Sequence, residues 1–458
     1  MASKRYDAGM EALHSLIKSV ASEISSQERR SRKRSTDAQH NFEYAITTIL
    51  TDIWKATVVS PEYECGMNKR TAYYSESPRY RDPNLTFKQT MAAFDGLIAL
   101  DMIEVTRNGF FDRETGNGGI TKYKAKDRLL ELLEGVEGNP FTHIKPDLDA
   151  ESIILRDHID GVRTVIDYED DAATNDMRKD LRIINTCLAK HWPDLRIKDE
   201  DYSALQERLM LDDAKQPVDF TQRILTRIFS NGRFDQGGRF YRAWWHNMPS
   251  EYRKFITIDG KRTCEYDYSQ LNPHMAYYLR GAELGSEDAY GRVFDGEHRP
   301  LVKQAFNAMM QAGTPLLNKP DGIDLTEVDL DWPILREAVL EAHRPLADVF
   351  FQGHGNHLQF IDSCIAEKVM LQFVKSDDEP VLPVHDSFIM HYAFGDMGEL
   401  EEAMRRAFHD HFKKDIKVSE DIGVMLPSSF DDMEFDDLSV EEIVNGPPEY
   451  SLWNERNS

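Results

Sequence analysis

The stretch KFITIDGKRTCEYDYSQLNPHMAYYL, residues 254–279, contains the pattern that decides the fold. An Asp-Gly pair separates two runs of β-forming residues, so we predict a hairpin. Alternation along its second strand places Thr263, Glu265 and Asp267 on one face. A helix is predicted directly afterwards, which puts Asp267 at a strand-to-helix junction. A carboxylate at the end of an apolar strand is costly unless a cation meets it, so Asp267 is a candidate for contact with a cation.

A second hairpin is predicted in EPVLPVHDSFIMHYAF, residues 379–394. Two β-forming runs flank His385-Asp386-Ser387, and so short a link permits only a tight turn. Aspartate is a common turn former, which is the ordinary interpretation of Asp386. Because apolar residues of a buried hairpin bracket it, we also consider a functional role.

Two cations lie one helical turn apart in HRPLVKQAFNAMMQAG, residues 298–313. Arg299 and Lys303 are four residues apart, so they share one face of the predicted helix. Two aligned cations can hold a polyphosphate, but such pairs are also common on solvated surfaces. The pattern alone leaves both interpretations open.

Taken in order, these segments resemble the motifs of a known superfamily. DYSQL, R-x3-K and VHDSF resemble motifs of the single-subunit RNA polymerases of phages and mitochondria, and of their relatives, the family A DNA polymerases. FDQGGRFYRAWW, residues 234–245, resembles a stretch upstream of the palm in the RNA polymerases. The resemblance covers residues 232–425 and implies an α+β fold with the palm and fingers of a right-hand polymerase.

The resemblance implies that two carboxylates hold metal. Asp267 and Asp386 would together hold two Mg²⁺ ions, for which Mn²⁺ can substitute, and the backbone carbonyl of Tyr268 would be a further ligand. Mg²⁺ prefers oxygen ligands and commonly takes one or two carboxylates from the protein. Two such ions activate the attacking oxygen and neutralise the leaving pyrophosphate. We interpret Glu265 as a surface or structural carboxylate rather than a third ligand.

The resemblance also implies a site for the incoming nucleotide. Arg299 and Lys303 would bind its phosphates, and one of them, for which Lys303 is the candidate, would protonate pyrophosphate. His385 would support the primer terminus, as a further catalytic residue. Arg239 would contact the template or the nascent strand.

Two positions depart from the family pattern and bear on sugar selection. Asn272 stands where family A DNA polymerases carry a glutamate that excludes ribonucleotides. Gln311, followed by an alanine, stands where both relatives carry a tyrosine-glycine pair that senses the sugar. We include both residues among the nucleotide-binding candidates. The upstream GGRFY favours ribonucleotides, and use of deoxynucleotides stays open.

The N-terminal part predicts a nucleic-acid-binding module. A helix, a short turn, a strand and a long hairpin between residues 39 and 145 are typical of a winged helix, which binds nucleic acids or docks proteins. Basic and aromatic residues alternate on the hairpin, which suits phosphate contact and base stacking. The candidate nucleic-acid contacts there are Arg107, Arg113, Lys122 and Lys124.

We expect five segments along the chain. They are a helical basic arm (1–38), a winged-helix-like domain (39–145), a helical connector or thumb-like region (146–230), the palm and fingers (231–427) and an acidic flexible tail (428–458).

Charge and composition restrict the class of protein. The 458 residues carry 55 Lys and Arg against 80 Asp and Glu, and the net charge of −25 disfavours nucleic acid unless a cleft has its own field. The sequence has no run of 18 apolar residues and no signal peptide, so we expect no membrane partner and a cytoplasmic location in a bacterial or phage-infected cell. The 4 cysteines have no CxxC spacing, which predicts reduced thiols rather than a zinc site.

These patterns together predict a Mg²⁺-dependent, template-directed nucleotidyltransferase, a compact RNA polymerase or primase acting on DNA in phage or plasmid replication. Its partners would be a DNA template, an RNA or DNA product and nucleoside triphosphates, in an oligomeric state that the sequence does not fix. The alternatives are a family A-like DNA polymerase, an untemplated terminal nucleotidyltransferase and a non-catalytic winged-helix regulator that binds nucleic acid.

Overall fold

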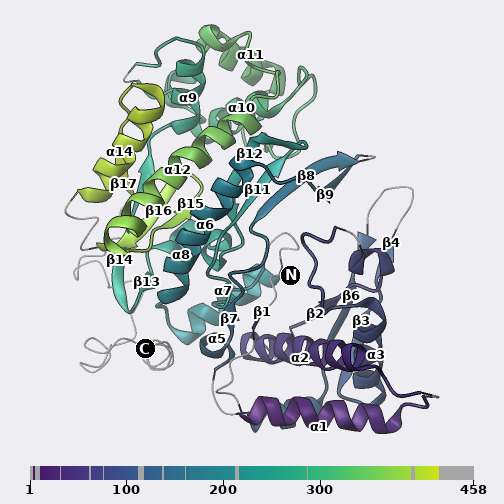
Figure 1. The fold of residues 1–458 in the computed structure, drawn as a ribbon. Helices are drawn as coiled ribbons and strands as arrows, with labels where there is room; N and C mark the ends of the chain where they lie inside the picture. Colours follow the sequence, from purple (N-terminus) through teal and green to yellow (C-terminus); the bar gives the residue numbers. More distant parts are fainter. Residues whose placement is uncertain are drawn as a thin grey trace.

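Buried hydrophobic residues divide the computed structural model into two cores (Figure 1). One core is built from residues between Leu13 and Val136, and the other from residues between Phe141 and Val418. We call the first part, residues 11–136, the N-terminal module and the second, residues 139–421, the body. The structure describes residues 4–5, 11–30, 32–60, 63–75, 77–111, 118–136, 139–159, 161–211, 216–285, 287–392 and 398–421.

The N-terminal module packs helices against a three-stranded antiparallel sheet in the order β2-β6-β3. Its elements are α1 (Glu11–Gln27), α2 (Thr36–Val59), β2 (Cys65–Met67), η1 (Thr71–Tyr74), α3 (Phe87–Ala99), β3 (Ile103–Arg107), β6 (Thr121–Ala125) and α4 (Asp127–Glu134). The β3–β6 hairpin extends into a second pair of short strands, β4 (Phe110–Phe111) and β5 (Gly118–Gly119). Leu13, Ile17 and Val20 recur at helical spacing and bury one face of α1 in this core.

A short helix, α5 (Pro140–His143), and a short strand, β7 (Lys145–Pro146), lead from the module into the body. β7 pairs with β1 (Lys4–Arg5), which precedes the module in the chain. Asn139 caps α5, because its side chain accepts a hydrogen bond from the Phe141 N–H at 2.9 Å.

A four-stranded sheet in the order β12-β11-β8-β9 begins the body. β11 and β8 run parallel, and the other pairs are antiparallel. Its strands are β8 (Ile153–Ile159), β9 (Val162–Ile166), β11 (Thr226–Ser230) and β12 (Arg233–Tyr241). Gly237 and Gly238 have φ of 75° and 78°, at the place where the register between β11 and β12 shifts. The GG of the GGRFY stretch therefore forms a bulge that a residue with a side chain would strain.

The segment 146–230, which the sequence analysis assigns to helices, is only partly helical. It contains α6 (Ala172–Lys190) and α7 (Asp199–Met210), but also β8, β9, β10 and β11. The run FTQRILTRIFSN, residues 220–231, ends in β11 rather than forming an amphipathic helix. A short apolar run fits a buried strand as well as a helix, and pairing with β8 and β12 decides the outcome here.

The largest sheet has six strands and contains both predicted hairpins. Its order is β10-β13-β14-β16-β15, and β17 also pairs with β14. The strands are β10 (Pro193–Leu195), β13 (Ile256–Ile258), β14 (Lys261–Tyr268), β15 (Leu382–Val384), β16 (Ser387–His391) and β17 (Val418–Asp421). The first hairpin is confirmed, with Asp259 and Gly260 at φ of 54° and 70° in its turn. The second is confirmed as well, because Val384 pairs with Ser387 across a two-residue turn.

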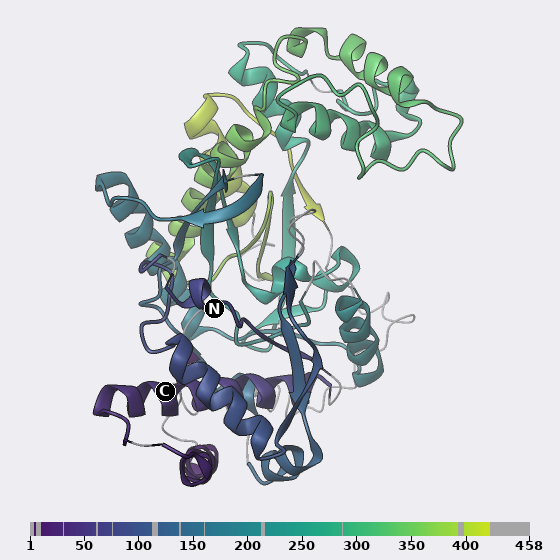
Figure 2. The same cartoon turned by 90° about the vertical axis from the view of Figure 1, so that its right-hand side faces the viewer.

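Helices surround this sheet, and α12 is the longest of those described in the body. They are η2 (Trp244–Asn247), α8 (Ser250–Arg253), α9 (Leu271–Leu279), η3 (Phe294–Gly296), α10 (Arg299–Gln311), α11 (Trp332–Ala342), η4 (Arg344–Leu346), α12 (Gly355–Asp377) and α14 (Glu399–Phe412). α12 packs against β12, α6 and α14. α9, α10 and α11 lie at the end of the body farthest from the N-terminal module (Figures 1 and 2).

The chain is thus a mixed α+β protein with mainly antiparallel sheets, as the sequence predicts. Within the described residues, no helix has an apolar stretch long enough to cross a bilayer.

Candidate active site

The three segments singled out in the sequence meet at one pocket of about 260 Å³. It is lined by the end of β14, the start of α9, the start of α10 and the β15–β16 turn. The lining residues are Asp267, Tyr268, Ser269, Gln270, Leu271, Asn272, Tyr290, Arg299, Lys303, Asp386 and Ser419.

Strand pairing brings the two predicted carboxylates to the same wall. Asp267 lies opposite Ser387 in the β14–β16 ladder, so Asp386 is one residue beyond its cross-strand partner. The backbone N–H of Tyr268 donates to the carbonyl of Asp386 at 3.4 Å. His385, the first residue of the turn, has a φ of 59° and is exposed, as the tight turn requires. Both carboxylates are half-buried and border the pocket.

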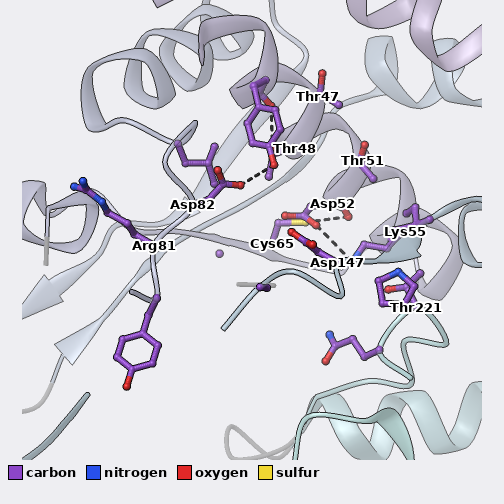
Figure 3. A pocket seen from close by; sticks show the side chains of 18 of the residues that line it. Thr47, Thr48, Thr51, Asp52, Lys55, Cys65, Arg81, Asp82, Asp147 and Thr221 are labelled. Atoms are coloured by element: carbon purple, nitrogen blue, oxygen red, sulfur yellow. Dashed lines mark hydrogen bonds and ion pairs between the residues drawn. The ribbon is translucent and has the colours of Figure 1, made fainter. Parts of the chain in front are cut away.

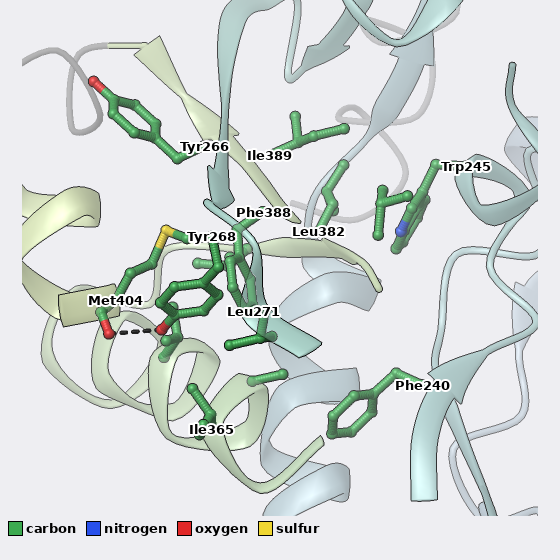
Figure 4. Packing of buried hydrophobic residues seen from close by; sticks show 14 of the residues in the cluster. Phe240, Trp245, Tyr266, Tyr268, Leu271, Ile365, Leu382, Phe388, Ile389 and Met404 are labelled. Carbon is green, nitrogen blue, oxygen red and sulfur yellow. Dashed lines mark hydrogen bonds between the residues drawn. The ribbon is translucent and has the colours of Figure 1, made fainter. Parts of the chain in front are cut away.

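Tyr268 offers its backbone to this pocket, not its ring. Its side chain is buried, and its hydroxyl donates to the carbonyl of Met404 at 2.6 Å (Figure 4). Leu271, which lines the pocket, and Phe388 pack in the same hydrophobic cluster as the Tyr268 ring (Figure 4). Packed hydrophobic side chains therefore support this side of the pocket and fix the positions of the two carboxylates relative to each other.

The donor set fits Mg²⁺ by its chemistry. Two carboxylates and a backbone carbonyl are oxygen ligands, and Mg²⁺ usually keeps several waters beside one or two protein carboxylates. In the described part of the chain, no group of three or more His, Cys, Asp or Glu side chains is placed to hold a metal ion. A site of two carboxylates, a carbonyl and waters does not need such a group.

Two cations face the carboxylates from α10. Arg299 begins the helix, and Lys303 follows one turn later on the same face. Nε of Arg299 lies 2.5 Å from Oδ2 of Asp288, and this hydrogen bond raises the pKa of Arg299. Lys303 is exposed, and none of the described carboxylates forms an ion pair with it. The pocket thus presents anionic and cationic groups to the same volume.

Tyr290 closes one side of the pocket. Its side chain is 3% exposed, and the guanidinium carbon of Arg299 lies 5.4 Å from the centre of its ring. Burial, together with the negative charge of Asp386, raises the pKa of its hydroxyl. Sequence analysis missed Tyr290 and Asp288 because both lie in a loop without a recognisable pattern.

Amides connect the start of α9 to its neighbours. Nδ2 of Asn272 donates to Oδ1 of Asn307 on α10 at 3.1 Å. Oε1 of Gln270 accepts a hydrogen bond from the Ala289 N–H at 2.5 Å. Gln311, the other nucleotide-binding candidate, lies at the far end of α10, outside the pocket lining, where its Nε2 donates to Oδ1 of Asn356 at 2.9 Å. The structure brings Asn272 into the pocket and leaves Gln311 outside it.

A buried ion pair lies beside Asp386. Nε of Arg239 lies 2.6 Å from Oδ2 of Asp362, whose side chain is 2% exposed. Burial raises the pKa of Asp362 to about 6; Arg239 opposes this shift and Asp386 adds to it. Burial alone would lower the pKa of Arg239, but the charges of Asp362 and Asp386 raise it. Arg239 is therefore held between two carboxylates.

Asp362 was missed by sequence analysis although it leaves a signal. It is an aspartate among the apolar positions Leu358, Ile361 and Ile365 of α12, where a charge requires a partner. The contact of Arg239 with nucleic acid stays a prediction, because its observed partner is Asp362.

Two further candidates lie close by in the sheet, His385 in the β15–β16 turn and Glu265 on β14. Although the side chain of His385 is exposed, neighbouring groups partly desolvate its ring and so lower its pKa, and the charge of Arg239 adds to the effect. Glu265 is buried, accepts from Ser387 Oγ at 2.5 Å and forms an ion pair with Arg253 at 3.1 Å. These contacts agree with a structural role for Glu265.

The nucleic-acid candidates of the N-terminal module lie on the β3–β6 hairpin. Arg107 is exposed and pairs in register with the half-buried Lys122. Lys124 forms an ion pair with Glu104 at 3.7 Å. Arg113 lies outside the described residues.

Comparisons with known proteins give a weak structural likeness. No family model matches the sequence, and no curated protein matches it. A solved structure that it resembles is the POL domain of Pol1 from M. smegmatis in complex with DNA primer-template and dNTP. The two are 14% identical, and the match covers 89% of this chain and 72% of that chain with a TM-score of 0.30. A TM-score this low does not establish a shared fold.

Proposed function

We propose that the protein is a divalent-metal-dependent, template-directed nucleotidyltransferase that extends RNA on a DNA template, as a compact RNA polymerase or primase. The observation that supports this most is the single pocket bordered by Asp267 and Asp386 on one side and by Arg299 and Lys303 on the other. Carboxylates that hold divalent cations opposite side chains that bind phosphate are the requirements of phosphoryl transfer from a nucleotide.

The residues have separate roles in this proposal. Asp267, Asp386 and the carbonyl of Tyr268 would hold Mg²⁺, which would supply stabilisation of the ionised 3′-oxygen and of the charge on pyrophosphate. The 3′-oxygen attacks the α-phosphorus, and the bond to the bridging oxygen of pyrophosphate breaks. Arg299 and Lys303 orient the leaving phosphates, and Lys303 supplies a proton to pyrophosphate.

Arg299 must change partner when nucleotide binds. Its guanidinium is held by Asp288 in the structure, with the side chain 47% exposed. The phosphate oxygens of a triphosphate can accept two parallel N–H hydrogen bonds from the guanidinium, as the Asp288 carboxylate does. They carry more negative charge, so a triphosphate competes with Asp288 for Arg299. In the absence of nucleotide, Asp288 occupies the place of the phosphates and keeps the guanidinium of Arg299 oriented.

The arrangement of the body and the module supports the same function. In our proposal the six-stranded sheet with α12 and α14 is a polymerase palm, and α9–α11 correspond to fingers. The order α2, β2, η1, α3, β3, β6 and the sheet order β2-β6-β3 support a winged helix. A winged helix next to a palm favours an enzyme that acts on nucleic acid over one whose substrates are free nucleotides alone.

Asn272 supports the use of ribonucleotides. Its amide lies in the pocket beside that of Asn307, and an amide can both donate to and accept from a 2′-hydroxyl. A carboxylate at this place offers acceptors alone. The pocket therefore favours ribonucleotides, and family A-like DNA synthesis is the alternative.

The test is a matrix of templates and nucleotides with products resolved by length. Purified protein is incubated with Mg²⁺, with single-stranded DNA or no template, and with either ribonucleotides or deoxynucleotides. We expect template-dependent RNA, lost in Asp386→Asn and retained in Asp321→Asn, an exposed aspartate outside the pocket. Use of dNTPs alone identifies a DNA polymerase, and products without template identify a terminal transferase. Absence of any product, with oligonucleotide binding intact, identifies a non-catalytic regulator.

A further inference from the structure

A cleft of about 2640 Å³ separates the N-terminal module from the body. Figure 3 shows part of its wall, with Thr47, Thr51 and Lys55 along α2 and Thr221 of the body nearby. The lining contains more lysines and arginines than aspartates and glutamates, the reverse of the whole chain with its 55 bases and 80 acids. The cleft is thus a locally basic region of an acidic protein.

Within the described residues, 6 of the 13 lysines and arginines that line this cleft form ion pairs with carboxylates. Arg79 pairs with Glu151, Asp167 and Asp170, and Lys55 pairs with Asp219. Such pairs form part of the structure and offer little to a ligand. Arginines that have no acidic partner are therefore the informative ones.

Three arginines gather on the four-stranded sheet without a carboxylate. Arg156 on β8 and Arg163 on β9 are diagonal neighbours, because the register pairs Arg156 with Val165 and His158 with Arg163. Arg242 directly follows β12. No ion pair joins any of the three to a carboxylate within the described ranges, and Arg163 has a hydrogen bond of 3.4 Å to Ser230 Oγ.

Arg163 and Arg242 both line the cleft, and Arg156 lies diagonal to Arg163 on the neighbouring strand. Burial lowers the pKa of Arg156, and repulsion from Arg163 and Arg242 lowers it further. Burial also lowers the pKa of Arg242, opposed only by Tyr73. An anion that binds beside these guanidinium groups offsets positive charge that no carboxylate of the described residues neutralises by an ion pair.

Two tyrosines lie beside the arginines, one toward the pocket and one on the N-terminal module. Tyr241 lies in the cleft lining, with its ring 6.3 Å from that of His385, the neighbour of Asp386. Tyr73 belongs to the N-terminal module, is 40% exposed and lines the same cleft as Arg242. Arg242 itself has a φ of 78°, an unusual conformation for a non-glycine residue. The arginines and tyrosines thus extend from the β15–β16 turn to the wall of the cleft that the N-terminal module forms.

We propose that Arg156, Arg163 and Arg242, with Tyr73 and Tyr241, bind a single strand of nucleic acid that runs between the pocket and the cleft. The arginines contact its phosphates, and the exposed tyrosine stacks on an unpaired base, which a duplex cannot offer. The four-stranded sheet that carries the arginines lies between α9–α11 and the N-terminal module in both views (Figures 1 and 2). This inference deepens the proposed function, because it assigns the path of the strand that the same pocket would use.

The test measures binding without catalysis. Fluorescence anisotropy with a fluorescein-labelled oligo(dT) and with a labelled hairpin duplex is recorded in EDTA over a range of salt concentrations. The variant combines Arg156→Gln, Arg163→Gln and Arg242→Gln. The matched control changes three exposed arginines that have carboxylate partners and lie outside the cleft and the pocket, Arg208→Gln, Arg344→Gln and Arg405→Gln. Both triple variants lose the same charge, and their urea midpoints verify folding.

We expect the cluster variant to bind oligo(dT) at least tenfold more weakly than the control. Its log–log dependence on salt should be shallower by about 2, since each lost phosphate contact on a single strand removes about 0.7. Tyr73→Leu should weaken binding about fivefold or more through the loss of stacking, whereas Tyr73→Phe should retain it.

Equal affinities and salt slopes for the two triple variants would overturn the inference. A loss confined to the duplex would overturn the assignment to a single strand. Because the assay contains neither nucleotide nor metal, it is independent of synthesis. Cluster-dependent binding by a protein that makes no product would support this inference and refute the proposed function.

Discussion

The pocket and the cleft are two hollows of very different construction. The pocket has about 260 Å³ and is lined by residues of the body, chiefly from a strand end, a tight turn and two helix starts. The cleft has about 2640 Å³, and its walls come from the N-terminal module and from the body. The pocket places carboxylates opposite cations, whereas the cleft has arginines without acidic partners on one wall.

Under the proposed function, this difference separates the site of chemistry from the site of nucleic-acid binding. The pocket residues are fixed by strand pairing and packed hydrophobic side chains, which is what positioning of reactive groups requires. The cleft residues are spread over two cores and suit a long, flexible polyanion. Changes in one hollow should therefore leave the other function largely intact, and the predictions below use that independence.

The largest expected effect is from Asp267→Asn. The amide has the shape of the carboxylate but not its charge, so we expect nucleotide incorporation to fall at least about a thousandfold, while oligonucleotide affinity is retained. The double variant with Asp386→Asn should be no worse than either single variant, because the two carboxylates act as a unit. Rates from single-turnover extension measure both. Additive losses in the double variant would contradict a shared metal site.

The next effect is on nucleotide binding. Arg299→Gln removes the bidentate contact with phosphate, and we expect the KM for nucleotide to rise about 10- to 100-fold. Arg344→Gln is the matched control, since Arg344 is also exposed and also forms an ion pair with a nearby carboxylate. Steady-state kinetics with varied nucleotide distinguishes them. An unchanged KM in Arg299→Gln would place the triphosphate elsewhere.

A smaller effect is expected from the β3–β6 hairpin. Changing Arg107 and Lys122 together to glutamine should weaken nucleic-acid binding about three- to tenfold and leave the rate of incorporation at saturating template unchanged. Anisotropy and extension assays on the same preparations test this. A fall in the saturated rate would show that the hairpin contributes to chemistry, which would break the separation of the two hollows.

The smallest effect concerns the pH dependence of stability at Asp362. Its folded-state pKa of about 6 lies above the ordinary 3.8, so its contribution to the free energy of unfolding is fully present below pH 3.8 and is lost as pH rises through 6. Between pH 5.5 and 7.5, the unfolding free energy of the wild type relative to Asp362→Asn should fall by about 1 kcal/mol. Urea unfolding at the two pH values measures it. A difference that does not change with pH would contradict a raised pKa.

Local sequence patterns predicted the pocket well for a physical reason. Asp267, Asp386, Arg299 and Lys303 each lie in a short segment whose hairpin or helix is encoded locally by turn residues and periodicity. Once β14 pairs with β16, the register fixes where the two carboxylates lie. A few local decisions thus determine most of the site.

The parts that sequence did not predict depend on contacts between distant segments. Asp362 acquires its role only because α12 packs beside β12, which brings Arg239 within 2.6 Å. Arg156 and Arg242 are 86 positions apart, and the order β12-β11-β8-β9 brings the strand that carries Arg156 and the strand that precedes Arg242 into one sheet. Segment 220–231 was misassigned for the same reason, since its strand exists through its neighbours.

The most direct measurement of the central claim is the position of a bound metal. Crystals of the protein grown with Mn²⁺ and a non-hydrolysable nucleoside triphosphate analogue give an anomalous signal that locates each ion without assumptions about activity. We predict ions bridging the carboxylates of Asp267 and Asp386, with the triphosphate reaching Arg299 and Lys303. Manganese and nucleotide bound at any other place, with these two carboxylates free of metal, would contradict the account.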